Sequence, residues 1–349
     1  MKSLHARDNR RYPVAPLCAL LGVSKQAFYK YDEAKSLFKN LLITNALKFI
    51  MEVRSIDPGI GGMKLWHLYE QEQGLVYHIG RDKFEDIIDA YNLKVRKRKR
   101  ISTKTTDSNH DLPLYPNLVK ELIPTRPNQL WVGDITYIPV WVSEHRYVFA
   151  YLSIILDAYT EEIVGWSLGD TLETCHPVEA LKMALKRLEF AEKIDLIHHS
   201  DRGCQYASYQ YTELLKTHGI KISMTESGDP KDNPQAERIN NTVKNELLKG
   251  LVYHSIEDLY NDLIIKIDFY NTRRPHMSID MMTPAQAAFC EGEIKKRWHS
   301  YREAAIKANR DALEIAENSL PLPAVRGLLP AYGLQSTPDS DKTRKVNRT

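Results

Sequence analysis

Cysteine is scarce in this chain, and its few copies lie far apart. Cys18, Cys175, Cys204 and Cys290 form no C-x-x-C pair within the 349 residues. Structural zinc sites are built from closely spaced Cys and His pairs, so the sequence excludes a zinc module of that kind. We expect four free thiols in a reducing compartment, with Cys204 an incidental loop residue rather than a nucleophile.

Long apolar runs are also lacking. No stretch approaches the length of a membrane span, and residues 1–8 contain no apolar core of a signal peptide. No internal repeat is apparent. We therefore do not expect a membrane protein or a secreted protein. A chain of 349 residues with 43% hydrophobic content is long enough for a full α/β core and one or two small helical domains.

Positive charge is modest overall but concentrated at the front of the chain. The net charge is +3, yet residues 1–106 hold 20 Lys and Arg against 11 Asp and Glu, whereas the remainder holds 28 against 34. The densest run precedes the polar residues 102–110 and favours a flexible linker that follows a phosphate backbone. Its candidate DNA contacts are Arg96, Lys97, Arg98, Lys99 and Arg100. The alternative is a solvated tether with no role in DNA binding.

Two aspartates occupy places that a plain protein core would not give them. Asp134 lies inside the β-branched and aromatic run 130–142, whose period of two predicts a strand. Asp201 follows the short apolar run 194–200, which predicts a second strand. Ligand sites of α/β sheets lie at such strand ends, so Asp201 is a candidate ligand.

A third acid, Glu237, lies on a predicted helix over 233–248 that contains no breaker after its first turn. At about 100° per residue, Asn241 lies about 40° and Lys244 about 20° from Glu237 around the helix, whereas Glu246 lies about 180° away. Asn241 and Lys244 are therefore expected to share the face of Glu237.

Converging carboxylates suit phosphodiester chemistry. Attack on a phosphodiester is helped by two divalent cations about 3.5 to 4 Å apart, one on each reacting oxygen. Mg²⁺ prefers carboxylate oxygens, so Asp134, Asp201 and Glu237 are candidate ligands of two Mg²⁺ ions, for which Mn²⁺ is expected to substitute. The alternative is a set of solvated acids, because the chain holds 45 acidic residues and such spacings arise often.

Five motifs around these residues occur in an order that is found in one known family. They are Pro127-Asn128-Gln129-Leu130-Trp131-Val132-Gly133-Asp134-Ile135-Thr136-Tyr137-Ile138, His199-Ser200-Asp201-Arg202-Gly203-Cys204-Gln205-Tyr206, Asp232-Asn233-Pro234-Gln235-Ala236-Glu237-Arg238, Tyr270-Asn271-Thr272-Arg273-Arg274-Pro275-His276 and Thr283-Pro284-Ala285-Gln286. In this order they resemble the integrase-core transposases of the IS-three insertion-sequence family, specifically the product of its second reading frame. The resemblance covers about residues 15–290.

The resemblance implies a DDE enzyme that performs Mg²⁺-dependent cleavage and DNA strand transfer at insertion-sequence ends. The catalytic triad, which is also the metal-ligand set, falls on Asp134, Asp201 and Glu237. The basic residue that follows the glutamate in the family falls on Lys244, which with Asn241 would position the scissile DNA end.

Three further residues of these motifs are candidates near that end. They are His199, Tyr206 and Arg274. For His199 the alternative of a strand-end residue oriented by packing stays open.

The resemblance also implies partners and a location. The partners would be double-stranded DNA, at transposon ends and target, and further copies of the chain assembled on that DNA. An upstream-frame DNA-binding protein or a frameshift fusion with it is a further expected partner. The location would be the bacterial cytoplasm, at the nucleoid when bound to DNA, without a membrane.

Two short helical units precede the basic run. In the first, predicted helices at 16–21 and 25–30 flank a turn, the layout of a helix-turn-helix. Its second helix either enters a major groove through Lys25, Gln26 and Lys30 or packs as a plain helical hairpin.

The second unit resembles the helix-turn-helix domain that precedes the core in the same family. Its predicted helices span 41–53, 63–73 and 81–91. Arg81 and Lys83 are candidate DNA contacts, because recognition helices use their first residues on base edges, and Lys64 is a third candidate. The expected core residues are Trp66, Leu68, Phe84 and Ile87.

The expected fold class is α/β: a ribonuclease-H-like mixed sheet preceded by small all-α helix-turn-helix domains and followed by a helical C-terminal extension. Further strands are expected at 145–156 and 162–168, and further helices at 176–190, 207–218 and 255–270. The expected domains are a helix-turn-helix unit at 1–40, a second at 41–93, a basic linker at 94–125, the catalytic core at 126–290, and a helical extension with a mobile tail at 291–349.

Two rival functions remain open at this stage. One is a nuclease of the same fold that cuts DNA but does not join it. The other is an inactive relative that serves as a DNA-binding repressor or architectural factor.

Overall fold

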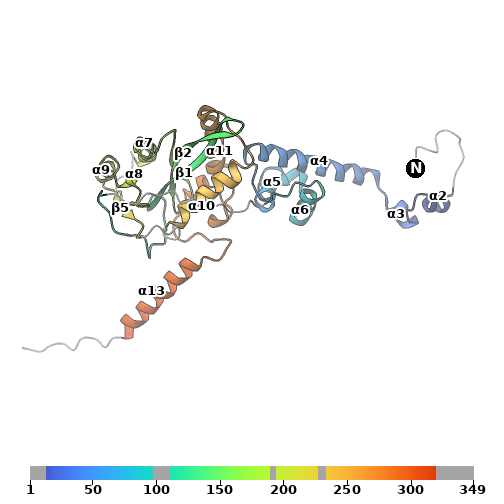
Figure 1. Cartoon of the computed structure of the whole chain (residues 1–349). Helices are drawn as coiled ribbons and strands as arrows, with labels where there is room; N and C mark the ends of the chain where they lie inside the picture. Colours follow the sequence, from blue (N-terminus) through green and yellow to red (C-terminus); the bar gives the residue numbers. More distant parts are fainter. Residues whose placement is uncertain (1–12, 97–110, 189–193, 227–232, 320–349) are drawn as a thin grey trace, which may run out of the picture. The chain divides into compact units, whose positions relative to one another are not determined.

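A computed structural model describes residues 13–96, 111–188, 194–226 and 233–319. The chain divides into two compact units, Met1–Ser300 and Tyr301–Thr349 (Figure 1). In the described part of the second unit, a single helix, α13 (Tyr301–Ser319), is present. No helix in the described ranges is both long and apolar enough to cross a membrane.

The first unit begins with the predicted helix pair. Helix α2 spans Val14–Leu20 and α3 spans Lys25–Lys30. The Ser24 hydroxyl accepts a hydrogen bond from the Ala27 amide at 3.0 Å and so caps α3.

Helix α4 (Glu33–Ile56) is longer than the sequence indicates and crosses position 41, where we expected a helix to begin. Its cap explains the difference, because the Asp32 carboxylate accepts a hydrogen bond from the Lys35 amide at 3.2 Å. The acid thus satisfies an amide that has no partner inside the helix.

Helices α5 (Gly62–Tyr77) and α6 (Arg81–Ala90) pack on α4 to form a helical domain. Its core surrounds Tyr69, whose ring lies 5.4 Å from that of Phe49 and 5.1 Å from that of Phe84. The expected core residues divide accordingly: Leu68 and Phe84 are buried, while Trp66 and Ile87 are partly buried and pack against them.

The segment expected to be the catalytic core contains one five-stranded sheet, which confirms the predicted mixed α/β class. In spatial order the strands are β3 (Ile163–Gly169), β2 (Arg146–Asp157), β1 (Leu130–Ser143), β4 (Ile197–Ser200) and β5 (Lys221–Met224). The β1–β2 and β2–β3 pairs are antiparallel, whereas β1–β4 and β4–β5 are parallel. The four-residue strand β5 was not anticipated.

Helices cover both faces of this sheet (Figure 1). One apolar cluster joins the sheet to α7 (Cys175–Leu185) and α9 (Tyr209–Thr217), and the other joins it to α10 (Pro234–Thr242) and α11 (Ile256–Thr272). The period of two in β1 decides the partner, since Trp131 belongs to the first cluster and Val132 to the second.

Short elements complete the unit. They are the 3₁₀ turns η2 (Lys186–Leu188) and η5 (Met277–Ile279), the helices α8 (Cys204–Ala207) and α12 (Pro284–Ala287), and the π-helical turn η4 (Val243–Leu247). The predicted helix 233–248 therefore ends in a π turn rather than continuing as an α-helix.

Helix α7 packs tightly against strand β3 at Gly165. A Cβ atom on Gly165 of β3 would lie 2.1 Å from the Ala180 carbonyl oxygen of α7. Gly165→Ala should therefore lower the free energy of unfolding by about 2 to 3 kcal/mol, because α7 must move away from the sheet. Thermal unfolding followed by circular dichroism measures the change.

The matched control is Gly61→Ala, where an added methyl group meets nothing within 4 Å. It should lower the melting temperature much less than Gly165→Ala. Equal effects of the two substitutions would contradict the packing argument.

Candidate active site

Asp134 lies on β1, the strand that pairs with β2 on one side and β4 on the other. Its carboxylate is held twice: Oδ1 accepts a hydrogen bond from the Ile135 amide at 2.9 Å, and Oδ2 accepts one from Asn240 Nδ2 at 2.7 Å. The strand and the helix α10 thus fix the direction of this side chain together.

Asp201 comes directly after β4, as the sequence predicts. Because Gly133 of β1 pairs with Ser200 of β4 in parallel register, Asp134 and Asp201 follow paired residues on neighbouring strands. The Asp201 Oδ1 atom accepts a hydrogen bond from the Gly203 amide at 3.0 Å, which holds the carboxylate against its own turn.

Glu237 lies in the first turn of α10, and two amide side chains fix that turn on the sheet. Asn233 caps the helix and donates from Nδ2 to the Gly133 carbonyl oxygen at 3.4 Å. Gln235 donates to the Ala158 carbonyl oxygen at 2.9 Å. The loop before α10, including Asp229, Pro230 and Lys231, lies outside the described residues.

The three carboxylates influence one another electrostatically. Burial raises the pKa of Asp134 to about 8, and the negative charges of Asp201 and Glu237 add to the rise. The Ile135 amide and the positive charge of Lys244 oppose it. The protein therefore gathers negative charge around a half-buried carboxylate, which destabilises its ionised form.

The side chains as they stand do not enclose an ion. Within the described ranges, no three His, Cys, Asp or Glu side chains converge closely enough to form a metal cage. The donors that meet around Asp134 are nevertheless carboxylate oxygens, the ligands that Mg²⁺ and Mn²⁺ prefer. They fit a hard divalent cation in kind.

Lys244 lies on the π turn η4, next to the acids. The pKa of Lys244 is lowered by partial desolvation, while the charges of Asp134 and Glu237 act in the opposite direction. The ammonium group thus shares its surroundings with two members of the predicted triad.

Asn240, rather than its neighbour Asn241, contacts the acids. Asn241 is exposed and accepts a hydrogen bond from Asn245 at 3.3 Å, whereas the buried Asn240 donates to Asp134. Sequence reasoning missed Asn240, although its place three residues after Glu237 puts it on a neighbouring part of the helix surface.

The three further motif candidates are buried. His199 contacts the Ser223 hydroxyl through Nδ1 at 2.9 Å, which agrees with a strand-end residue oriented by packing. Tyr206 packs its ring at 89° to that of Tyr211, with 5.2 Å between ring centres. Arg274 is 2% exposed and forms ion pairs with Asp57 and Glu246, so it points into the protein interior.

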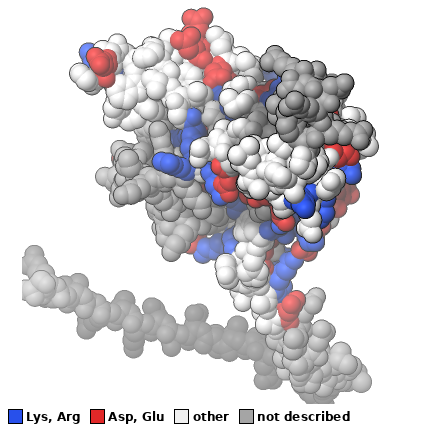
Figure 2. All heavy atoms as spheres, turned by 90° about the vertical axis from the view of Figure 1, so that its right-hand side faces the viewer, with Lys and Arg blue, Asp and Glu red and all other residues white. Residues whose placement is uncertain are grey.

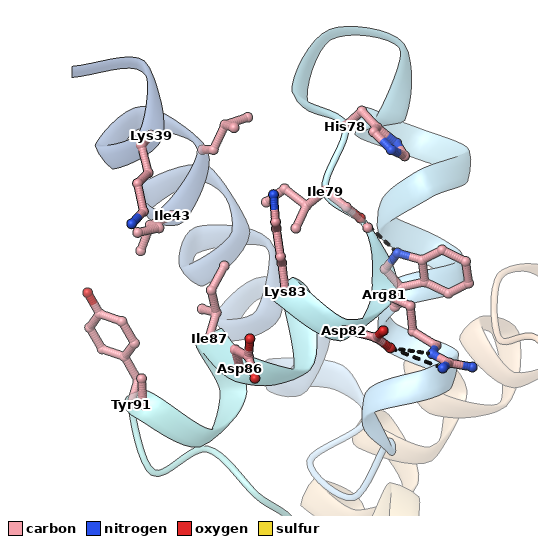
Figure 3. A pocket seen from close by; sticks show the side chains of 14 residues that line it. Lys39, Ile43, His78, Ile79, Arg81, Asp82, Lys83, Asp86, Ile87 and Tyr91 are labelled. Atoms are coloured by element: carbon pink, nitrogen blue, oxygen red, sulfur yellow. Dashed lines mark hydrogen bonds and ion pairs between the residues drawn. The ribbon is translucent and has the colours of Figure 1, made fainter. Parts of the chain in front are cut away.

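The candidate DNA contacts in the helices that precede the sheet lie mostly at the surface. Lys25, Arg81 and Lys83 are exposed. Arg81 pairs with Asp82 at 3.0 Å, and Lys83 extends separately from that pair (Figure 3). Lys64 does not reach the surface in the same way, because it pairs with Glu246 at 3.2 Å.

Helix α6 also borders a hollow of about 1200 Å³ in the helical domain. Lys39, Arg81 and Lys83 stand among its lining residues, with Ile43 and Ile87 contributing apolar surface (Figure 3). The predicted recognition helix is therefore accessible from one side.

The basic linker is only partly described. Arg96 is exposed, and its carbonyl oxygen accepts a hydrogen bond from Lys249, whereas Lys97, Arg98, Lys99 and Arg100 lie outside the described residues. On the face drawn in Figure 2, blue Lys and Arg side chains stand beside red Asp and Glu side chains. The described part of that face carries both signs of charge.

Comparison of the sequence with known proteins identifies its family. The "Integrase core domain" family matches residues 124–230, and a second family of the same description matches residues 218–284. Among solved structures, the HTLV-2 integrase catalytic core domain in complex with magnesium is 20% identical and has a TM-score of 0.35, over 47% of this chain and 97% of that chain.

Two full-length relatives come from Shigella sonnei. "Insertion element IS600 uncharacterized 31 kDa protein" is 32% identical over 272 residues, which are 77% of this chain and 96% of the relative. "Transposase for insertion sequence element IS629" is 32% identical over 295 residues, which are 82% and 95% of the two chains. The chain therefore belongs to the IS-three family of insertion-sequence transposases, and it is a DDE enzyme of DNA transposition with an integrase catalytic core.

Proposed function

We propose that this transposase cuts DNA at the ends of its insertion sequence and joins the exposed 3′ ends to target DNA, using a divalent-metal site formed by Asp134, Asp201 and Glu237. The supporting observation is that Asp201 and Glu237 act on Asp134: burial raises the pKa of Asp134 to about 8, and the negative charges of the two other acids add to the rise. A bound cation would offset both the desolvation cost of this carboxylate and its repulsion by the two neighbouring acids.

Each residue of the site has its own task. Bound there, two Mg²⁺ ions, or Mn²⁺ in their place, would supply Lewis-acid activation of the reacting oxygens. Asp134 offers an anionic oxygen whose direction the Asn240 hydrogen bond holds. Asp201 and Glu237 bring their oxygens from the loop after β4 and from α10.

Lys244 and Asn241 hold the scissile DNA end in this proposal. The ammonium group of Lys244 lies close enough to Asp134 and Glu237 to interact with their charges, so it can bind a phosphate beside the acids. Asn241 is exposed on the same helix and offers an amide to a base or phosphate.

Recognition of the element ends is assigned to the front of the chain. Arg81 and Lys83 at the start of α6 and Lys25 at the start of α3 would contact DNA. The basic run Arg96, Lys97, Arg98, Lys99 and Arg100 would follow the phosphate backbone between them and the core. Double-stranded DNA, further copies of this chain and an upstream-frame protein are the proposed partners.

Nearly isosteric substitution tests the metal site. Asp134→Asn, Asp201→Asn or Glu237→Gln should each reduce joining of labelled element ends in Mg²⁺ by roughly 10³-fold or more, because an anionic ligand is lost while the shape is kept. Gel analysis of products separates joining from hydrolysis alone and from binding alone. Hydrolysis alone by the parent protein would indicate the rival nuclease, and binding alone would indicate the inactive DNA-binding protein.

Asp195→Asn is the matched control, because Asp195 forms exposed ion pairs with Arg126 and Lys221 at the other end of β4. It should join ends like the parent protein. Substantial Mg²⁺-dependent joining by a folded triad variant would remove that residue from the proposed site.

Asn240→Ala should raise the Mg²⁺ concentration needed for half-maximal joining by roughly tenfold to hundredfold, because Asp134 loses the donor that orients it. A Mg²⁺ titration of joining rates measures the shift. The adjacent Asn241→Ala variant should keep the parental Mg²⁺ dependence, since Asn241 makes no hydrogen bond to the acids. Equal titration curves for the parent and Asn240→Ala would count against the orienting bond.

Lys244→Ala should weaken binding to element ends and reduce the slope of log affinity against log salt by about one unit, as expected when one phosphate contact is lost. Lys244→Arg should retain part of the joining activity, because it keeps the charge but changes the donor geometry. Binding measured by fluorescence anisotropy over a salt series checks both. Parental affinity of Lys244→Ala at every salt concentration would show an ordinary surface lysine.

A further inference from the structure

A cluster of four charged side chains, distinct from the acids that bind metal in the proposed function, has two buried members, Asp57 and Arg274, and two partly exposed ones, Lys64 and Glu246. Arg274, which is 2% exposed, contacts Asp57, which is fully buried, at 3.3 Å between Nε and Oδ2. Arg274 also pairs with Glu246, and Lys64 approaches Glu246 at 3.2 Å between Nζ and Oε2. Two basic and two acidic side chains are thus paired, although burial raises the pKa of Asp57 and opposes its ionised form.

The cluster is centred on the Arg274 guanidinium. His276 Nδ1 lies 3.2 Å from Arg274 Nη1, and His276 Nε2 lies 3.2 Å from the Tyr270 carbonyl oxygen. Because arginine can only donate, His276 accepts at Nδ1 and donates at Nε2, which is the neutral form. Burial and the charge of Arg274 lower the pKa of His276 well below its ordinary value, in agreement with this assignment.

The four charges come from three separate parts of the chain. Asp57 is the C-cap of α4 and Lys64 lies in the first turn of α5, so both belong to the helical domain. Glu246 lies on the π turn η4, and Arg274 follows α11 in the catalytic core. The cluster therefore joins the helical domain to the element that continues the Glu237 helix.

Backbone atoms support the same joint. The Gly59 amide donates to the Glu246 carbonyl oxygen at 3.0 Å, and a Cβ atom on Gly59 would lie 2.3 Å from Glu246 Cα. Lys266 of α11, which is 1% exposed, donates to the carbonyl oxygen of Ile56 at the end of α4. The loop between α4 and α5 is thus pressed directly against the π turn.

This turn is also where Lys244 is placed. A π turn contains one more residue than an α-helical turn and is rare in proteins outside functional sites. Glu246 faces the buried cluster, whereas Lys244, two residues earlier, interacts with Asp134 and Glu237. Contacts that fix the position of Glu246 therefore also fix the direction of Lys244 on the same turn.

We propose that Arg274 is a positioning residue: through Asp57 and Glu246 it fixes the DNA-binding helical domain on the π turn of the catalytic helix, and it thereby sets which phosphodiester of a bound DNA end meets the active site. This inference rests on the proposed function, because it assumes that the helical domain holds the end while the acids cut it. The predicted result of losing Arg274 is imprecise cutting in addition to slow cutting.

The neighbouring arginine provides a matched control. Arg273 pairs with Glu72 at 2.7 Å and with Glu52 at 3.5 Å, so it also links the core to the helical domain. That link is accessible to solvent, where ion pairs contribute little. Arg273→Gln therefore removes the same kind of side chain from the same joint without disturbing the buried cluster.

The experiment maps cut positions on a labelled duplex that carries the element end, with the full chain and Mg²⁺. Arg274→Gln should keep its affinity for the end, cut at neighbouring phosphodiesters as well as the parental one, and join roughly tenfold to hundredfold more slowly. Arg273→Gln should cut at the parental position. Hydrogen exchange should show that the Gly59 amide loses protection in Arg274→Gln but not in Arg273→Gln.

A second variant covers the case in which Arg274→Gln does not fold, because a lone substitution leaves buried charges without partners. Asp57→Asn, Lys64→Met, Glu246→Gln and Arg274→Met together remove all four charges and should give a folded protein with the same loss of cutting precision. Parental positions and rates in this variant would overturn the proposal. The proposal would also be overturned if the variant cut only at the parental position, with a lower yield, and its Gly59 amide stayed protected from hydrogen exchange.

The outcome for the parent protein separates the two levels of inference. If the parent neither cuts nor joins ends in Mg²⁺, the proposed function fails, and the exchange comparison then decides the anchoring by itself. Loss of Gly59 protection in the Arg274 variants would support the anchor, and its retention would refute it.

Discussion

Parallel pairing between β1 and β4 is the interaction on which the active site depends. It aligns Gly133 with Ser200, so the residues that follow, Asp134 and Asp201, end up side by side although they are far apart in the sequence. Helix α10 then packs on β1 and contributes Glu237, with the Asn240 hydrogen bond to Asp134 joining helix and strand. The acidic site therefore forms only when the sheet forms, because no local structure would bring the acids together without the β1–β4 register.

The site also shows what folding must overcome. Partly burying a carboxylate and placing two others near it opposes folding, as the raised pKa of Asp134 indicates. Two apolar clusters, one on each face of the sheet, supply the opposing stabilisation. The acids are therefore held together by packing around them rather than by their own interactions.

Local patterns in the sequence were sufficient for much of this architecture. The long hairpin β1–β2 and the end of β4 were predictable, because alternation and β-branched residues mark them over many positions. Strand β5 was missed since four residues, Lys221–Met224, carry too little periodicity, and only pairing with β4 makes them a strand. The family membership rests on motifs and relatives, whereas the metal and DNA roles of individual residues remain predictions.

Other features depended on partners that a local pattern does not reveal. Lys64 and Arg274 were both candidates for contacts with DNA, but their partners Asp57 and Glu246 come from distant segments and draw them into the interior. Assuming a continuous α-helix over 233–248 likewise missed the π turn, which the Gly59 loop contacts from outside the helix. Charge and helical phase indicate which residue types are present, while burial decides which of them meet solvent.

The unbroken length of α4 has a consequence of its own. Its 24 residues make it about 36 Å long, close to one turn of B-form DNA, about 34 to 36 Å. Each residue added to or removed from this helix changes its length by about 1.5 Å and rotates the preceding segment by about 100° around the helix axis. Length variation in this helix is therefore not gradual, since a single deletion would reorient the preceding segment far more than it would displace it.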